Sequence, residues 1–102
     1  MNYKIEIDTP SEIMGKIALR AKQLRLHYNL KRATLAQKSG VPESTIKRFE
    51  TTGKISFESL LKIATALDCL DEFSTLFPSI HPTSINDIER LEKRNLKKRG
   101  RT

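Results

Sequence analysis

Residues 30–50 read LKRATLAQKSGVPESTIKRFE, and this stretch predicts two short helices joined by a tight turn. Leu35 lies on the first helix, from about residue 31 to 39, and Gly40 supplies the left-handed backbone that ends it. Pro42 suits the first position of the second helix, because the amide hydrogen that proline lacks is not needed there. The order is therefore helix, glycine turn, helix.

The second of these helices has a polar face opposite its apolar one. On a helical wheel Ile46 and Phe49 point inward, and the helix is expected to end before Gly53. The residues on the opposite side are Ser44, Lys47, Arg48 and Thr51. When such a helix enters the major groove of DNA, a carboxylate near its N-terminus, such as that of Glu43, can accept a hydrogen bond from cytosine N4. The Arg48 guanidinium is long enough to donate two hydrogen bonds, to guanine O6 and N7. Polar residues at helical spacing alone are, however, more often the solvated face of an ordinary surface helix.

Helices are also predicted on both sides of this stretch. Thr9, Pro10 and Glu12 form a capping box with proline at the first helical position, so a helix begins there and ends near residue 28. Ser56 caps another helix. Its broad apolar set is Phe57, Leu60, Leu61, Ile63, Ala64 and Leu67. A fifth short helix, closed by Pro78, carries Leu70, Phe73, Leu76 and Phe77.

The chain divides into an arm (residues 1–8), a compact helical domain (residues 9–78) and a linker with a basic tail (residues 79–102). Apolar and charged residues alternate from Tyr3 to Ile7, which predicts a strand with one solvent-exposed face. A lone strand is unstable, so it is either a frayed arm or pairs with its copy in a second subunit. The tail holds seven basic and three acidic residues.

The composition favours a polyanionic partner and argues against several other classes of protein. The net charge is +7 on 102 residues, which suggests nucleic acid. Cys69 is the only cysteine, so we expect no internal disulfide and a reducing cytoplasm. No apolar run is long enough to cross a membrane. His27 and His81 are isolated, and we see no paired carboxylates, no phosphate loop and no metal-ligand spacing, so we expect neither an enzyme nor a cofactor or metal.

Four landmarks in residues 30–50 carry a family resemblance, namely Leu35-Ala36, Gly40-Val41, Thr45-Ile46 and Phe49-Glu50. Followed by Gly53, Lys54 and a leucine-rich helix, they resemble the Cro/C1-type (Xre) helix-turn-helix family over about residues 14–78. The resemblance implies an all-α, five-helix lambda-repressor-like DNA-binding domain with a short N-terminal strand or arm and a basic C-terminal tail. The partner it implies is a double-stranded DNA operator.

The same resemblance assigns roles to individual positions. The base-reading residues it implies are Glu43, Ser44 and Arg48, and the phosphate-contacting ones are Arg32, Thr45, Lys47 and Lys54. Arg32 stands where the family usually has a glutamine, and Thr51-Thr52 replaces the usual single asparagine. Arg25 and Glu50 match positions that pair between the first helix and the end of the third.

Operators of this kind usually have two half-sites, so a homodimer is expected. The dimer interface is expected to form from either the arm from Tyr3 to Ile7 or the segment from Leu70 to Phe77. The latter segment can equally belong to the domain core. The Thr-Pro opening, the Leu76-Phe77-Pro78 motif and the basic tail look like HipB-type antitoxins, which bind HipA-family kinase toxins. The tail would then face toxin or DNA, or add nonspecific phosphate affinity. A phage-type repressor, a restriction controller and a protein-binding adaptor with incidental DNA binding remain alternatives.

Overall fold

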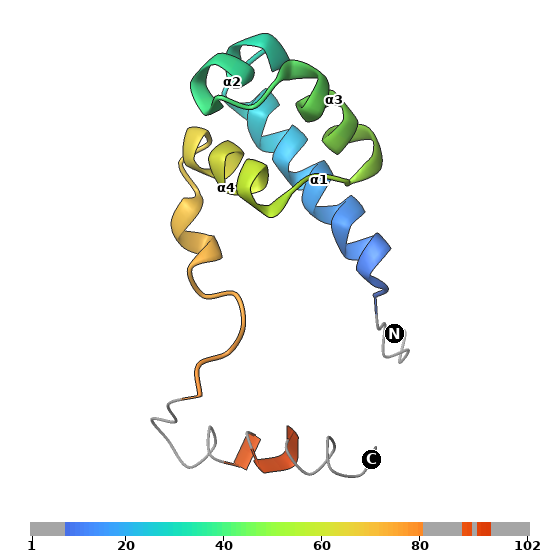
Figure 1. Cartoon of the computed structure of the whole chain (residues 1–102), viewed down its shortest axis with the longest axis vertical. Helices are drawn as coiled ribbons and strands as arrows, with labels where there is room; N and C mark the ends of the chain where they lie inside the picture. Colours follow the sequence, from blue (N-terminus) through green and yellow to red (C-terminus); the bar gives the residue numbers. More distant parts are fainter. Residues whose placement is uncertain (1–7, 81–88, 91, 95–102) are drawn as a thin grey trace.

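The computed structural model describes residues 8–80, 89–90 and 92–94. The elements named in those ranges are all helices (Figure 1): α1 (Pro10–His27), α2 (Arg32–Ser39), α3 (Glu43–Thr52), α4 (Phe57–Ala66) and the short 3-10 helix η1 (Leu70–Phe73). Residues 89–90 and 92–94 are also helical. The prediction of an all-helical domain is confirmed for this part of the chain, whereas the predicted N-terminal strand and most of the predicted tail lie outside the described residues.

The helix boundaries follow from local hydrogen-bonding chemistry. Thr9 Oγ1 accepts from the Glu12 amide at 3.1 Å, and a Glu12 carboxylate oxygen accepts from the Thr9 amide at 3.3 Å, which confirms the predicted capping box. Ser56 Oγ accepts from the amide three residues later at 3.1 Å. Gly40 and Gly53 end α2 and α3 with φ of 77° and 79°, values that residues with a Cβ adopt only at a cost.

Two boundaries differ from the sequence prediction. Pro42 caps α3 instead of occupying its first position, because its ψ of 143° is extended and the helix begins at Glu43. The fifth helix was predicted to reach Pro78, but η1 ends at Phe73. The residue before a proline is disfavoured in the helical region, and Phe77 instead has a left-handed φ of 66° and is 92% exposed. The chain therefore leaves the domain earlier than predicted.

The buried core holds α3 on a base made by the other helices. Its members are Ala18, Leu35, Val41, Ile46, Phe49, Ile63 and Leu67. α3 contacts both α1 and α2, and α2 also contacts α4. Phe57, predicted to join the apolar set of α4, is 58% exposed because it lies in the first turn at the edge of the domain. None of the described helices is long and apolar enough to span a bilayer.

Gly53, at the end of α3, lies close against α1. A Cβ at this position would lie 3.0 Å from the backbone carbonyl carbon of Met14 and 3.1 Å from its oxygen. At Gly40 the same atom would meet nothing within 4 Å. Gly53 is therefore required both by its left-handed backbone and by the neighbouring helix, and this contact fixes how the C-terminal end of α3 sits on α1.

Candidate nucleic-acid interface

α3 has one buried face and one face open to solvent. Ile46 and Phe49 are buried in the core. The exposed residues of the helix include Glu43, Ser44, Lys47, Arg48 and Thr51, and Thr45 is half-buried at the edge of this set. The chain's own described residues do not cover Ser44, Lys47 or Arg48, so the face can approach a flat or grooved partner. Its donors and acceptors are of the kinds that hydrogen-bond to base edges.

The two threonines at the end of α3 turn their hydroxyls back onto the helix. Thr51 Oγ1 donates to the Lys47 carbonyl oxygen at 2.8 Å, and Thr52 Oγ1 donates to the Arg48 carbonyl oxygen at 2.7 Å. Thr52 Oγ1 also accepts from the Lys54 amide at 3.1 Å. These bonds hold the start of the loop that carries the exposed Lys54. The threonine pair thus gives this loop a defined path.

The N-terminal ends of α2 and α3 differ from those of α1 and α4. Side-chain hydroxyls cap α1 and α4, whereas the residues before α2 and α3, Lys31 and Pro42, make no side-chain capping bond. The first turn of α2 also has no acidic residue. Free amides and the positive end of the helix dipole favour an anion at such a terminus. The start of α2 thus has the electrostatic character that suits a backbone phosphate.

A buried ion pair ties α1 to the end of α3. Arg25 Nε and Nη2 donate to the two Glu50 carboxylate oxygens at 2.7 and 3.0 Å, and Arg25 Nη1 donates to the Leu30 carbonyl oxygen at 2.7 Å. The two side chains are only 7% and 3% exposed. The bidentate geometry is the strongest form of an arginine-carboxylate contact. This pair fixes α3 relative to α1 and to the segment that leads into α2.

Glu50 also binds Arg32, at the start of α2. Arg32 Nε donates to Glu50 Oε1 at 2.9 Å, and the Arg32 side chain is 32% exposed. Burial alone would raise the pKa of Glu50, but hydrogen bonds from Arg25 and Arg32 and the charges of both guanidinium groups together lower it. The carboxylate is therefore ionised at neutral pH, and the cluster of Arg25, Arg32 and Glu50 carries a net charge of +1.

The comparison with protein families identifies this arrangement. The family described as Helix-turn-helix matches residues 22–72, which is half of the chain and includes α2, the glycine turn and α3 in full. The chain belongs to the helix-turn-helix family. The match supports the Cro/C1-type (Xre-like) character seen in the sequence and makes the protein a DNA-binding transcription regulator. No curated protein matches the chain.

Within this helix-turn-helix the predicted site residues fall into separate groups. Glu43, Ser44, Lys47 and Arg48 share the exposed face of α3, and Lys54 follows in the next loop. Arg32, predicted to contact phosphate, is drawn toward Glu50 and thereby joins the buried pair. Sequence alone did not indicate this contact, because it depends on how three helices meet.

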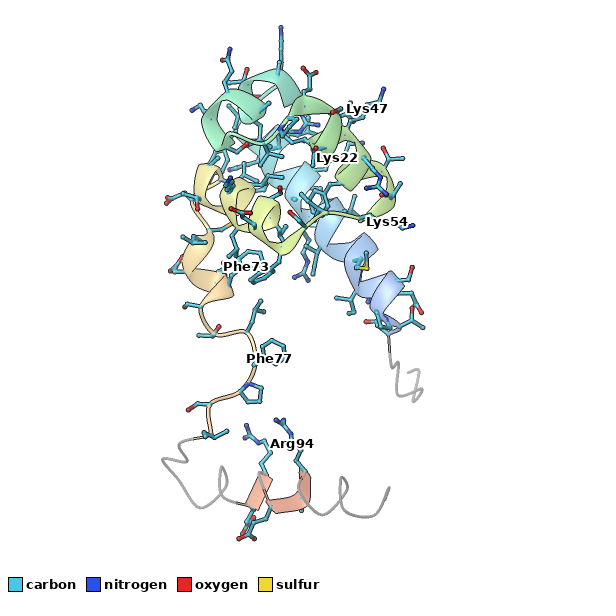
Figure 2. The ribbon with its side chains drawn as sticks, in the orientation of Figure 1. Lys22, Lys47, Lys54, Phe73, Phe77 and Arg94 are labelled. Carbon is cyan, nitrogen blue, oxygen red and sulfur yellow. The ribbon has the colours of Figure 1, made fainter. Side chains whose placement is uncertain are left out.

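Lys22 is a further basic residue near the helix-turn-helix. It lies on α1, is half-buried, and was not among the predicted DNA contacts. Figure 2 shows Lys22, Lys47 and Lys54 on the α3 side of the bundle. The sequence indicated only that Lys22 lies off the apolar stripe of its helix, since a helical wheel does not tell which neighbour a flanking residue faces. Lys22 is therefore an added candidate for a phosphate contact.

Proposed function

We propose that this protein is a transcriptional repressor that reads a specific duplex DNA operator with the exposed face of α3. The observation that carries the proposal is the seating of α3: Ile46 and Phe49 are buried under a face that presents Ser44 and Arg48 to solvent. A rigid helix with free polar side chains can enter the major groove, where each base pair offers a distinct pattern of donors and acceptors. Glu43, Ser44 and Arg48 are the proposed base readers.

The proposed phosphate contacts surround this face. Arg32 and the uncapped start of α2 would bind the backbone on one side of the groove. Other phosphates of the same duplex would be bound by Thr45 and Lys47 on α3 and by Lys54 in the following loop. These contacts carry no sequence information, but they set the orientation of α3 and account for the salt dependence of binding. The net charge of +7 supports this division of roles.

The repressor would act as a homodimer on two half-sites. One small reading head makes few base contacts, and each mismatch costs only about 1–3 kcal/mol, so a single copy gives little discrimination against the rest of a genome. Two copies related by a two-fold axis would read half-sites about one helical turn apart. An inverted-repeat operator is the expected consequence.

The finer proposal is a HipB-like antitoxin that represses its own operon and binds a HipA-family kinase toxin. It rests on the resemblance of the Thr9-Pro10 opening, the Leu76-Phe77-Pro78 motif and the basic tail to such antitoxins. The test is to co-express the protein with the product of the adjacent gene and purify through a tag on either one. Stable co-purification with a kinase-like neighbour would support it, and a neighbour of another class or no complex would remove it.

The DNA-reading proposal is tested by selection from a random duplex pool with the purified full chain. The expected result is enrichment of an inverted repeat, bound with a dissociation constant that rises as salt is increased, because counterions are released from phosphates. A scrambled duplex of the same length is the control and should bind more weakly at about 0.15 M salt. No enrichment, or binding that salt does not weaken, would overturn the proposal.

A further inference from the structure

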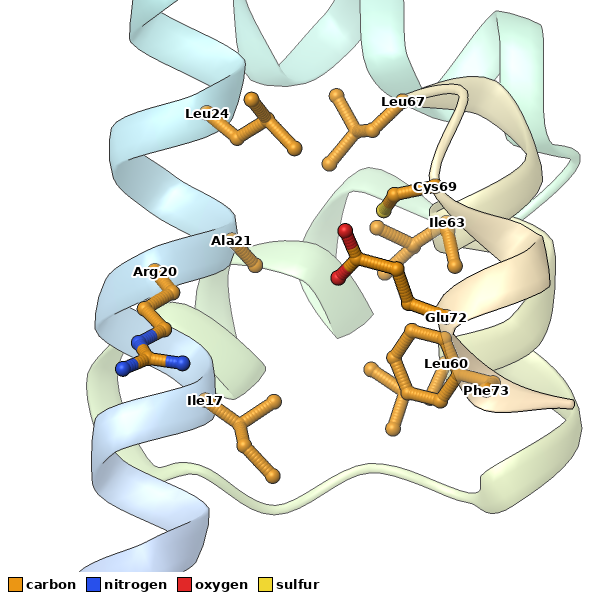
Figure 3. A pocket seen from close by; sticks show the side chains of 11 residues that line it. Ile17, Arg20, Ala21, Leu24, Leu60, Ile63, Leu67, Cys69, Glu72 and Phe73 are labelled. Carbon is orange, nitrogen blue, oxygen red and sulfur yellow. The ribbon is translucent and has the colours of Figure 1, made fainter. Parts of the chain in front are cut away.

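An apolar pocket opens between α1, α4 and η1, on the part of the domain that α3 does not occupy (Figure 3). Its volume is about 210 Å³. Most of its lining is aliphatic or aromatic: Ile17, Ala21, Leu24, Leu60, Ile63 and Phe73. A dry cavity of about 150 Å³ accommodates benzene, so this pocket is large enough for a phenyl ring.

The pocket walls carry little net charge. Figure 3 shows Arg20 on the α1 wall and Glu72 on the η1 wall, one base and one acid on opposite sides. Cys69 also lines the pocket, and burial together with the nearby acids Glu72, Asp71 and Asp68 raises the pKa of its thiol, which stays protonated. The lining therefore suits an uncharged occupant and does not suit the strongly basic residues of the tail.

Directly after η1 the chain exposes a segment with matching chemistry. Residues 74–80 read STLFPSI and contain no charged side chain. Leu76, Phe77 and Ile80 are exposed, and the Phe77 ring is the most exposed large apolar side chain of the described residues. Figure 2 shows Phe77 beyond Phe73, out of contact with the bundle. Leaving these groups in water is costly, at about 25 cal/mol per Å² of apolar area.

Phe77 does not line the pocket of its own chain and is 92% exposed. Phe77 has a φ of 66°, which is rare for a bulky residue, and Pro78 restricts its conformation further. Phe73, four residues earlier, already forms part of the pocket wall. The segment is therefore presented outward, where a neighbouring molecule can receive it.

We propose that the pocket receives Phe77 from a second copy of this chain, and that the two copies exchange their residue 74–80 segments about a two-fold axis. The pocket and its occupant are parts of the same surface, which is the requirement for a closed, self-complementary dimer. Such pairing would bring Arg20 of each copy toward the acidic η1 of the other, so the charges at the rim are complementary. The inference rests on the homodimer of the proposed function and names its interface.

The first test is the dimer dissociation constant of the full chain without DNA, measured by sedimentation equilibrium. Phe77→Ser should raise it about 100-fold, because two rings are lost and each contributes about tenfold. Leu26→Ser is the control: Leu26 is also exposed but lies on the side of α1 opposite Ala21 and Leu24, so the dissociation constant should not change. Equal melting temperatures of wild type and Phe77→Ser at a concentration where both are monomeric exclude unfolding as the cause.

The second test uses complementation between two defective variants. Ala21→Phe places a phenyl ring from α1 inside the pocket and blocks it, while Phe77→Ser leaves the pocket open without an occupant. Each variant alone should dimerise far more weakly than the wild type, but an equimolar mixture should form heterodimers about tenfold more tightly than Phe77→Ser pairs with itself, because the open pocket of one variant accepts Phe77 of the other. Recovery in the mixture supports the proposal, and its failure overturns it.

The outcomes separate this inference from the proposed function. A dimer dissociation constant that Phe77→Ser leaves unchanged would overturn the pocket as the interface and leave operator reading by α3 untouched. A wild-type chain that is monomeric at every accessible concentration would overturn both the interface and the free homodimer. Selection of a DNA site by α3 is measured independently, so loss of that activity would instead count against the proposed function.

Discussion

The Glu50 carboxylate accepts two hydrogen bonds from the Arg25 guanidinium, at 2.7 and 3.0 Å, and thereby ties the last turn of α3 to α1. Both side chains are buried, and the same carboxylate receives Arg32 from the start of α2. Side chains from α1, α2 and α3 thus meet at one acidic group. The position of α3 relative to α2 depends on it.

Removal of the carboxylate should strongly destabilise the domain. Glu50→Ala leaves the buried Arg25 without its counter-charge, and the free energy of unfolding should fall by about 3 kcal/mol. Urea denaturation followed by circular dichroism measures it. Lys16→Ala is the control, because the exposed pair of Lys16 and Asp8 should contribute only about 0–1 kcal/mol. A free energy of unfolding that Glu50→Ala leaves unchanged would refute the role assigned to the pair.

Stability should also depend on pH through this group. The pKa of Glu50 is lowered in the folded protein, so its ionised form contributes stability that is present above the unfolded value of about 4.3 and is lost as pH falls through the folded value. The difference in unfolding free energy between wild type and Glu50→Gln should therefore be largest near neutral pH and shrink on acidification below that value. A difference that is constant over the acid range would contradict the assignment.

The two left-handed glycines should respond differently to alanine. Gly40→Ala should cost about 1–2 kcal/mol, the usual penalty for a left-handed residue with a Cβ. Gly53→Ala should cost more, because the new methyl group also meets the Met14 backbone at 3.0–3.1 Å. Thermal unfolding of both variants gives the comparison, and an equal loss at the two positions would show that the approach of α3 to α1 is not tight.

Lys54 should contribute to DNA affinity without contributing to sequence preference. It is exposed in the loop after α3, and the proposed function assigns it to a backbone phosphate. Lys54→Ala should weaken binding to selected and scrambled duplexes by the same factor and reduce the slope of log affinity against log salt by about one. Titrations at several salt concentrations measure both effects. A loss confined to the selected duplex would move Lys54 from the phosphate contacts to the base contacts.

The sequence predicted the elements whose signals are local. The capping box at Thr9 and Glu12 and the left-handed glycines at 40 and 53 depend on a few neighbouring residues, so their helix ends were predictable. The link from Arg32 to Glu50 was not predictable, because it depends on three helices packing together. The early end of the fifth helix was missed because apolar spacing suggested a longer helix, while Pro78 and the left-handed Phe77 leave the segment outside it.

The sequence could define the polar face of α3 but could not show whether that face is exposed to solvent. A helical wheel places Ser44 and Arg48 opposite Ile46 and Phe49, yet it does not show whether another part of the chain covers them. The fold supplies that answer for the described residues, because α1 and α2 pack against the buried side of α3 and leave the polar side exposed. The pocket beside α4 was also not predictable from the sequence, because it is formed by side chains of α1, α4 and η1 and depends on how these helices pack.

The most direct measurement of the reading role of α3 is the ratio of the dissociation constants for scrambled and selected duplex, taken for wild type and Arg48→Ala at the same salt concentration. The account predicts that the ratio falls by about 5- to 150-fold in the variant, because a bidentate contact to guanine is worth about 1–3 kcal/mol of discrimination. If Arg48→Ala weakens binding to both duplexes equally and leaves the ratio unchanged, Arg48 does not read bases, and the central claim is contradicted.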